Sequence, residues 1–454
     1  MIPIVSPEEM AAIDAAAPEP VEVLIGRAGG AVARAAVQLL GGTYGRRVVV
    51  LAGKGNNGND GREAGRRLRR RGVRVLEVDA LAAPSELPAA DLVIDAAFGT
   101  GFRGAWRAPD TVAPVLAVDI PSGVDGLSGA VSERVMTAVR TVTFAALKPG
   151  LLLPPGRGHV GEIEVADIGL DVSGATAWLL TDDDVAAIVP PRAIDAHKWK
   201  AAVWIAAGSP GMTGAAHLSA RGAQRAGAGY VRLGTPGVAH DEAAPQEVVG
   251  FALPSERWAS RVLADLRRFH ALVVGPGLGR SDSAVSDVLA LVDSAEVPVV
   301  VDGDGLFAVA RRPEVARARS HPLVLTPHDG EFEALTGRPP GADRLAAARA
   351  LASDLGCVVL LKGSATVVAD GTGRVLVADQ GSPRLATAGT GDVLSGIIGA
   401  FLARGVPALE AAAAGAFVHG RAGNLGWPDG LVAGDLPDLV PVVLDSLHVP
   451  PLEA

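Results

Sequence analysis

The sequence predicts an α/β protein of two domains, each a mostly parallel sheet flanked by helices. Runs of Val, Leu and Ile that read as buried strands alternate with amphipathic helical runs along the 454 residues, which is typical of parallel βαβ units. The alternation lapses between residues 172 and 196, where TDDD and PPRA interrupt it, as expected of a domain junction. We therefore expect an N-terminal domain at 1–178 and a C-terminal domain at 179–454.

The N-terminal domain opens with a helix and then alternates strands with helices. Apolar residues from Ile25 to Leu39 recur at intervals of three and four, and the glycines at 41 and 42 are expected to end this helix. Another helix is expected over residues 62–71. The expected strands, rich in Val and Leu, are residues 48–53, 73–79, 90–96, 113–120 and 140–146.

The C-terminal domain shows the same alternation of strands and helices and ends in helices. A hairpin is expected over residues 366–379, where a Gly-containing turn joins two apolar runs, and helices are expected over 392–403 and 409–422. The remaining expected strands are 202–208, 230–236, 271–277, 297–305, 323–330 and 357–363.

Composition and charge exclude several classes of partner. The net charge of −9 and the pI near 5.5 argue against nucleic acid, whose binding usually needs a basic face. The longest apolar run, residues 393–403, is too short to span a bilayer, and the N-terminus lacks a basic leader region. The single cysteine, Cys357, lies in an apolar run and indicates a reducing compartment. We expect a cytoplasmic protein with neither nucleic acid nor a membrane as partner.

The segment GKGNNGND, residues 53–60, lies between a predicted strand and a predicted helix. Its glycines match the G-x-G-x-x-G pattern of dinucleotide-binding folds, but such a match is weak by itself. Asn56, Asn57 and Asp60 do not fit a pyrophosphate cradle, because amide and carboxylate oxygens suit a hard cation or a polar ligand better. The segment therefore predicts a polar site rather than a typical nucleotide loop.

Two carboxylates end further predicted strands of this domain. Asp95 opens DAAFGTGFRG at 95–104, and Asp119 opens DIPSGVDG at 119–126. In an open parallel sheet such strand ends converge on the crevice where ligands bind. An Asp in this place can also be a cap or a turn residue, but three polar clusters at strand ends favour a binding site.

These segments, together with the tail VTFAALKPGLLLPPGRGHVGEIEVADIGL, resemble the NAD(P)H-hydrate epimerase family, a Rossmann-like fold, over residues 1–175. The resemblance implies a potassium ion on Asn57, Asp95 and Ser122. Asn59 departs from the family, which usually has a second glycine there. The resemblance also implies that the hydrated cofactor contacts Asn56, Asn57, Gly58, Asn59, Asp60, Gly99, Thr100, Gly101, Phe102, Arg103, Gly104, Ala105 and Asp119. Asp119 is expected to act as acid and base when water is lost and re-added at C6.

The most specific signal of the C-terminal domain is TAGTGDVLSG at residues 387–396. Gly389 and Gly391 flank Thr390 ahead of an apolar helix, where backbone N–H groups would form a cradle for a phosphoryl group. Asp392 at the same point would take the proton of an attacking hydroxyl, although an Asp there can also simply cap the helix. The P-loop pattern GxxxxGK[ST] is absent from the sequence.

GTGD after the strand end KGSAT resembles the ribokinase-like superfamily. The segments HKWKAAVWIAAGSPGMTGAAHLSARGAQRAGAGYVRL, VVGPGLG, VVDGDGL and LTPHDGEFEALTG narrow the resemblance to the ADP-dependent NAD(P)H-hydrate dehydratases, over residues 181–454. Trp199 departs from the HKG pattern of that family and is expected to reshape the entrance to the site.

The dehydratase resemblance implies a set of binding residues. The hydrate would lie near Ala215 or Ala216, Gly277, His328 and Asp392, although a lone His is more often structural. Residues 382–391 and the strand end before them would hold ADP, with magnesium on its phosphates. The nucleotide-binding residues would be Lys362, Gly363, Ser364, Ala365, Thr366, Thr387, Ala388, Gly389, Thr390 and Gly391.

Together the two resemblances imply an enzyme that repairs hydrated nicotinamide cofactors. One domain would interconvert the R and S epimers of NAD(P)HX. The other would phosphorylate the C6 hydroxyl of the S epimer with ADP, with Asp392 as base, and eliminate phosphate to return NAD(P)H. Ribokinase-like sites are often completed by a neighbouring subunit, so a homo-oligomer is expected.

Two alternatives stay open on the sequence alone. The first is a small-metabolite kinase with an accessory ligand-binding domain, against which the TPHDGE and HK segments and the N-terminal domain weigh. The second makes the N-terminal domain a binding or scaffolding module without chemistry. The polar residues at its strand ends weigh against a scaffold, which has no need of Asn57, Asp60, Asp95, Asp119 and Ser122.

Overall fold

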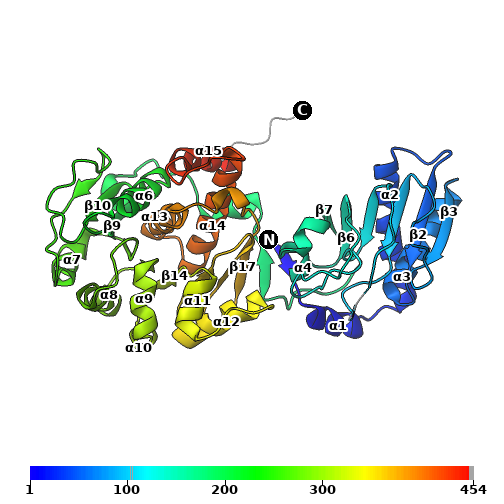
Figure 1. The fold of residues 1–454 in the computed structure, drawn as a ribbon, viewed down its shortest axis with the longest axis horizontal. Coiled ribbons are helices and arrows are strands. Elements are labelled where there is room, and N and C mark those ends of the chain that lie inside the picture. Colours follow the sequence, from blue (N-terminus) through cyan, green and yellow to red (C-terminus); the bar gives the residue numbers. More distant parts are fainter. Residues whose placement is uncertain (103, 105, 449–454) are drawn as a thin grey trace. The chain divides into compact units, whose positions relative to one another are not determined.

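The computed structural model describes residues 1–102, 104 and 106–448. Over these residues the chain forms two compact units, which are described separately: residues 2–177 form the first, and the residues from 178 onward, with Met1, form the second. Each unit is a mostly parallel sheet covered by helices (Figure 1). The predicted α/β class is confirmed.

The sheet of the first unit runs in the order β3-β2-β4-β5-β6-β7, and every neighbouring pair is parallel. All the strands predicted for this unit are present, although most are shorter than predicted; β7 and the short strand β1, which lies outside this sheet, are additional. The strands are β1 (Ile2–Ile4), β2 (Arg47–Ala52), β3 (Arg74–Asp79), β4 (Leu92–Ala96), β5 (Val115–Val118), β6 (Arg140–Phe144) and β7 (Glu162–Ala166). The helices are α1 (Pro7–Ala16), α2 (Val21–Leu40), α3 (Asn56–Arg70), α4 (Pro149–Leu152) and the 3-10 helix η1 (Gly156–His159).

Both faces of this sheet are buried, which explains why its central strands are continuously apolar. Val48 and Val50 of β2 pack into the core that includes α2 and α3. Val49 and Leu51 pack into a second core on the opposite face, because successive side chains of a strand point to opposite faces. A ligand can therefore reach the central strands only at their ends, which is where the polar residues lie.

Helix α2 is, among the described residues, the one helix long and apolar enough to cross a membrane, with a mean hydropathy of 1.3 over 18 residues. Half of that window is buried inside the protein. Ala28, Val32 and Ala36 on its inner side belong to the core of the sheet. Packing against the sheet accounts for the apolar character of this helix.

The sheet of the second unit runs in the order β8-β17-β16-β15-β14-β13-β12-β9-β10-β11. The strands from β14 to β11 are parallel, and β15, β16 and β17 pair antiparallel, as the predicted hairpin requires. The strands are β8 (Ala177–Leu179), β9 (Ala202–Ala206), β10 (Tyr230–Gly234), β11 (Val249–Gly250), β12 (Ala271–Val274), β13 (Val299–Val301), β14 (Leu323–Leu325), β15 (Val358–Leu361), β16 (Thr366–Ala369) and β17 (Val375–Ala378).

Helices α6 and α13 of this unit approach each other closely, through glycine. A Cβ on Gly396 would lie 2.0 Å from the backbone oxygen of Ser219, and a Cβ on Gly222 would lie 2.4 Å from that of Val393. The contact fixes the start of α13 against α6. The helices are α5 (Asp182–Ile188), α6 (Thr213–Arg225), α7 (Ala259–Asp265), α8 (Asp282–Ser294), α9 (Asp304–Arg311), α10 (Glu314–Arg317), α11 (Asp329–Thr336), α12 (Arg344–Leu355), α13 (Thr390–Ala403), α14 (Ala408–Leu425) and α15 (Leu436–His448), with the 3-10 helices η2 (Lys198–Ala201), η3 (Leu266–Arg268) and η4 (Pro383–Leu385).

Two of the helices that begin earlier than the sequence predicted carry polar residues of the predicted sites. Helix α3 begins at Asn56 instead of residue 62, because NNGND forms its first turn after Gly55. Helix α13 begins at Thr390 instead of Asp392, with Gly389 in the left-handed region (φ 93°) before it. As a result Asn57, Asp60 and Asp392 all project from first turns, beside the carboxyl ends of strands.

Candidate active sites

The first unit has a cavity of about 510 Å³ at the carboxyl ends of β2, β4 and β5. Of the predicted substrate residues, Gly58, Asn59 and Gly104 do not line it, and Arg103 and Ala105 lie outside the described residues. Gly58 instead permits a tight loop, because a Cβ there would lie 2.0 Å from the oxygen of Gly53. The predicted residues that line the cavity are Asn56, Asn57, Asp60, Gly99, Thr100, Gly101, Phe102 and Asp119.

Asp119 is paired with a buried lysine that the sequence analysis did not select. The ammonium of Lys148 donates to Oδ1 of Asp119 at 2.7 Å and also to Oγ1 of Thr143 at 2.8 Å. Thr143 donates to the same Asp119 oxygen at 3.1 Å. Asp119 has a φ of 67°, a conformation that residues other than glycine, Asn and Asp rarely adopt. The carboxylate is thus fixed in place at the wall of the cavity.

Asp60 lies in the same cavity, in a different electrostatic environment. Burial, and then the negative charges of Asp119 and Asp14, raise the pKa of Asp60 to about 8. Asp60 is therefore a neutral acid at pH 7, whereas Asp119 faces an ammonium group. Two carboxyl groups with separated roles are the arrangement that acid–base catalysis requires.

Asp95 and Ser122, two of the predicted potassium ligands, are in contact. The backbone N–H and the hydroxyl of Ser122 donate to Asp95 at 2.7 Å and 2.6 Å. Burial raises the pKa of Asp95 to about 6, although its hydrogen bonds to Ser122 and Ala97 lower it. Among the described residues Asp95 has no cationic partner within 4.0 Å, so this fully buried carboxyl lacks a positive counter-charge.

Asn57, the third predicted potassium ligand, has an unsatisfied side chain. Neither its Oδ1 nor its Nδ2 has a hydrogen-bond partner among the described residues, and both atoms are buried. A Cβ on Gly99 would lie 3.4 Å from Cγ of Asn57 and 3.2 Å from Oδ2 of Asp119, so the amide lies close to Asp119. Buried amide groups normally have partners, so the side chain of Asn57 is available to bind a ligand.

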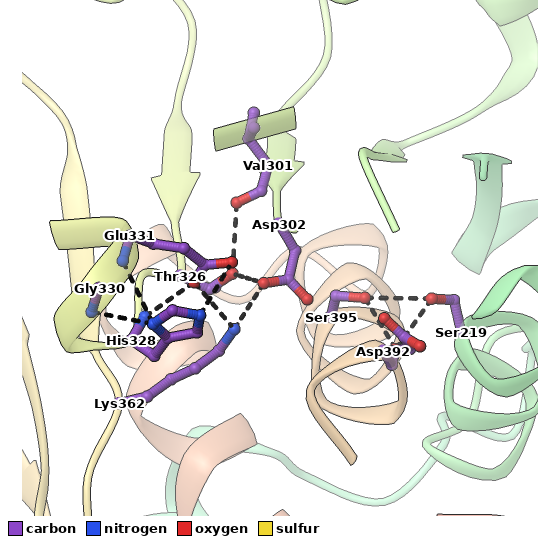
Figure 2. Close-up of polar contacts among 10 residues, drawn as sticks. All are labelled: Ser219, Val301, Asp302, Thr326, His328, Gly330, Glu331, Lys362, Asp392 and Ser395. Atoms are coloured by element: carbon purple, nitrogen blue, oxygen red, sulfur yellow. Dashed lines mark hydrogen bonds and ion pairs between the residues drawn. The ribbon is translucent and has the colours of Figure 1, made fainter. Parts of the chain in front are cut away.

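In the second unit, Lys362 is held by carboxylates at the carboxyl ends of β13 to β15. Its ammonium donates to Oδ1 of Asp302 at 2.6 Å and lies 3.9 Å from Oε2 of Glu331, as Figure 2 shows. Thr326 donates to the same Asp302 oxygen at 2.7 Å. Burial lowers the pKa of Lys362, but the charges of Asp302 and Glu331 outweigh it and raise the pKa overall.

Asp392 begins α13 beside this group of charges. Its backbone oxygen accepts hydrogen bonds from Ser219 at 2.9 Å and Ser395 at 2.8 Å (Figure 2). These bonds hold the main chain and leave the carboxylate available. Burial and then Asp302 raise the pKa of Asp392 to about 7, against the lowering effect of Lys362. A carboxylate with this pKa is suited to accept a proton near neutral pH.

A cavity of about 380 Å³ adjoins Lys362 and the start of α13. Ala365 is 2% exposed and points into the core, and residues 387–389 shape the loop without lining the cavity. His419 lines it with a buried Nε2 that has no partner among the described residues. Burial lowers the pKa of His419 to about 4. The predicted nucleotide residues that line the cavity are Lys362, Gly363, Ser364, Thr366, Thr390 and Gly391.

The residues predicted to bind the hydrate differ from one another in burial and in their contacts. Gly277 has a φ of 63°, and a Cβ there would lie 2.9 Å from Cβ of Ala215. Ala216 is fully buried in the core, so Ala215 is the alanine that faces the Gly277 loop. His328 caps α11: its Nδ1 accepts hydrogen bonds from the backbone of Gly330 and Glu331. The remaining ring nitrogen, Nε2, is then the N–H that can meet a ligand.

Lys148, Asp302, Glu331 and His419 are polar groups at these sites that were not selected from the sequence. Lys148 interrupts the apolar run VTFAALKPGLLL, and a lysine in such a run must find an anion when it is buried. Asp302 ends the apolar strand VVV in the same manner as Asp95. The sequence therefore contained a signal for both residues. Asp302 is a charged residue at the end of an apolar strand, and Lys148 is a charged residue within an apolar run.

The chain was compared with known families and structures. Residues 203–440 match the NAD(P)H-hydrate dehydratase model, and residues 21–87 and 76–150 match the YjeF-related protein N-terminus. The bifunctional NAD(P)H-hydrate repair enzymes of Mycobacterium leprae and Moorella thermoacetica are 40% and 36% identical, over 86% and 89% of this chain and 85% and 88% of theirs. The ADP/ATP-dependent NAD(P)H-hydrate dehydratase of Bacillus subtilis, co-crystallised with ATP and Mg²⁺, has a TM-score of 0.51 and 29% identity, and it covers 59% of this chain and 98% of its own.

Proposed function

Because the chain belongs to the family of bifunctional NAD(P)H-hydrate repair enzymes, we propose that the cavities of its two units are the epimerase and dehydratase active sites. Such an enzyme interconverts the epimers of hydrated NADH or NADPH. It returns the S epimer to NAD(P)H while ADP is converted to AMP and phosphate. The expected division at residues 1–178 and 179–454 would assign one activity to each domain.

In the first unit we assign acid–base work to Asp119 and Asp60. Loss of water from C6 needs a proton on the leaving hydroxyl, and its return needs a base for the incoming water. The neutral carboxyl of Asp60 can supply that proton, and the carboxylate of Asp119 can stabilise the iminium-like species. When water adds again, Asp119 can accept its proton and Asp60 is reprotonated, so that both groups return to their starting state. The observation that supports this division is the raised pKa of Asp60 beside the Lys148-bound Asp119.

A potassium ion on Asn57, Asp95 and Ser122 is part of the proposal. The unpartnered amide oxygen of Asn57 and the buried Asp95 without a counter-ion suit an oxygen-ligated cation. Among the described residues no three Asp, Glu, His or Cys side chains gather to hold a metal, which fits a monovalent ion better than a divalent one. The ion would supply a fixed positive charge for an anionic part of the substrate.

In the second unit we assign ADP to the cavity beside Lys362 and general-base catalysis to Asp392. The C6 hydroxyl oxygen attacks the β-phosphorus of ADP, the bond to AMP breaks, and Asp392 takes the hydroxyl proton. The ring-nitrogen lone pair then expels phosphate from C6, and loss of the C5 proton returns NAD(P)H. Lys362 balances phosphate charge, His419 offers its free Nε2 to the nucleotide, and magnesium bound to the phosphates supplies further positive charge.

The raised pKa of Asp392, about 7, at the start of the helix whose residues Thr390 and Gly391 line the cavity, is the observation that carries the dehydratase assignment. The test is recovery of absorbance at 340 nm from racemic NADHX with ADP and Mg²⁺, comparing wild type with Asp392→Asn. Full recovery by wild type alone supports both sites. Recovery that stops near half contradicts the epimerase assignment. No recovery by wild type, with ADP or with ATP in its place, would contradict the repair activity and favour the small-metabolite kinase.

We also propose that the chain acts as a homo-oligomer in the cytoplasm. The single thiol, Cys357, is buried and free among the described residues, which suits a reducing compartment. Light scattering coupled to size-exclusion chromatography tests the oligomer: a mass of one chain, 45.9 kDa, contradicts it.

A further inference from the structure

The second unit has another cavity, of about 460 Å³, that none of the proposed chemistry uses. It lies where β9 and β10 begin: Lys200 and Ala201 directly precede β9, and Gly229 directly precedes β10. Arg404, which ends α13, forms another part of its wall.

This cavity is remote from the dehydratase site. The loops around Asp392 follow the carboxyl ends of parallel strands, whereas this cavity lies at the amino ends of β9 and β10. Asp392 and Arg404 stand at opposite ends of α13, and twelve residues of helix correspond to about 18 Å. Trp199, expected to reshape the entrance to the active site, belongs to this amino edge instead, where it stacks on Tyr230 with ring centroids 4.4 Å apart.

The lining of the cavity carries one sign of charge. Among the residues that the structure describes, no Asp or Glu lines it. Lys200 is paired with the exposed Asp195 at 2.5 Å, but within the described chain Arg192, Lys198 and Arg404 have no ion-pair partner among the carboxylates. A concave surface with several unpaired cations favours an anionic ligand. The basic residues of the lining are Arg192, His197, Lys198, Lys200 and Arg404.

Backbone carbonyls hold the two arginines in place. Arg192 donates to the oxygens of Gly227 and Ala228 at 2.8 Å and 3.2 Å, and Arg404 donates to the oxygens of Pro190 and Ala226. Burial, and then the like charge of Arg192, lower the pKa of Arg404. The two guanidinium groups are thus fixed on the neighbouring carbonyls of residues 226–228, and guanidinium geometry matches phosphate well.

The cavity has room for more than a phosphate group. A volume of about 460 Å³ lies in the range of small-molecule sites, roughly 300–1,000 Å³. Pro190, Pro191, Ala193 and Val406 supply apolar wall beside the cations. We propose that this cavity binds a phosphorylated organic metabolite, with its phosphate on Arg192, Arg404 and Lys198 and its organic part against the prolines.

Calorimetric titration of the full chain tests this site. The protein is first saturated with ADP and Mg²⁺, so that the nucleotide cavity is filled, and ribose 5-phosphate, inorganic phosphate or ribose is then added. We expect ribose 5-phosphate to bind with one site per chain, inorganic phosphate to bind more weakly, and ribose not to bind. Each of Arg192→Gln and Lys198→Gln, both at exposed positions, should weaken ribose 5-phosphate binding about tenfold or more.

Arg312→Gln is the matched control, since Arg312 is an exposed arginine of the same unit outside the cavity. It should bind ribose 5-phosphate as wild type does. Absence of binding in wild type overturns the proposal, as does binding that neither Arg192→Gln nor Lys198→Gln weakens. Tighter binding of inorganic phosphate than of ribose 5-phosphate contradicts the organic part of the ligand. Because ADP is present throughout, failure here leaves the dehydratase assignment unaffected.

Discussion

The ammonium group of Lys148 lies 2.7 Å from Oδ1 of Asp119, and the two side chains are only 1% and 14% exposed. Thr143 of β6 is hydrogen-bonded to both groups, which ties the pair to the sheet. Asp119 also has a left-handed backbone conformation. A buried ion pair and local strain at one residue are typical of functional sites, where they hold a group in its working geometry.

Lys148→Met should therefore unfold the first unit more easily and abolish epimerisation. The substitution leaves the Asp119 carboxylate without its counter-ion, and breaking a buried pair in this way costs about 3–5 kcal/mol. Chemical denaturation measures the stability, and recovery at 340 nm should stop near half, because the dehydratase is intact. Arg70→Met, at an exposed position on α3, should change neither. Full recovery by Lys148→Met would falsify the role of the pair.

Asp60→Asn should stabilise the first unit at pH 7 while epimerisation is lost. The folded pKa of Asp60, about 8, lies above the unfolded value of 3.8, so its contribution to stability is present below pH 4 and is lost as the pH rises toward 8. Each pKa unit corresponds to about 1.4 kcal/mol. Thermal unfolding at pH 4 and pH 8 should show a smaller decline for Asp60→Asn than for wild type. An equal decline in both proteins would contradict the raised pKa.

The pKa of Asp392, about 7, predicts how dehydration depends on pH. The rate at saturating ADP should rise with pH as the carboxylate ionises and level off above pH 7. Asp392→Asn should lower kcat by about 10²- to 10⁴-fold at every pH. Asp282→Asn, at an exposed carboxylate at the start of α8, should keep the wild-type profile. A wild-type rate that falls between pH 6 and pH 8 would rule out Asp392 as the base.

The sequence was sufficient to predict the fold class and to select most of the polar residues at strand ends. Asp95 and Asp119 could be selected because a carboxylate that ends an apolar strand has few structural reasons to be there. Lys148 could not be assigned to Asp119 from sequence, because 29 residues separate them and only the parallel pairing of β5 with β6 brings them together.

The ion pairs and the first residues of the helices could not be predicted from the sequence either, because both depend on tertiary structure. The pairing of Lys362 with Asp302 joins residues that are 60 positions apart. The early start of α3 at Asn56 ran against the low helix propensity of NNGND, which packing of the helix against α2 and β2 overrides. The periodicity of apolar residues predicts neither the ion pair between Lys362 and Asp302 nor the start of α3.

Gly396→Ala should destabilise the second unit and impair dehydration together. The new methyl group would lie 2.0 Å from the backbone oxygen of Ser219, and overpacking of this kind costs about 1–3 kcal/mol. Relief requires α13 to move from α6, which would displace Asp392. Gly434→Ala, with open space around its Cβ, serves as the control. Unchanged thermal stability of Gly396→Ala would show that the two helices are not in the contact described.

Lys362→Met should shift the pH profile of dehydration upward as well as weaken ADP binding. Lys362 lowers the pKa of Asp392, against burial and Asp302, so its removal raises that pKa. Loss of a nearby opposite charge moves a carboxyl pKa by about one unit or more. The midpoint of the kcat profile should therefore move from near pH 7 toward pH 8, and KM for ADP should increase. Lys362→Arg keeps the charge and should keep the midpoint even if KM rises. If the midpoint of Lys362→Met stays with wild type, the ammonium acts on the nucleotide alone and does not set the basicity of Asp392.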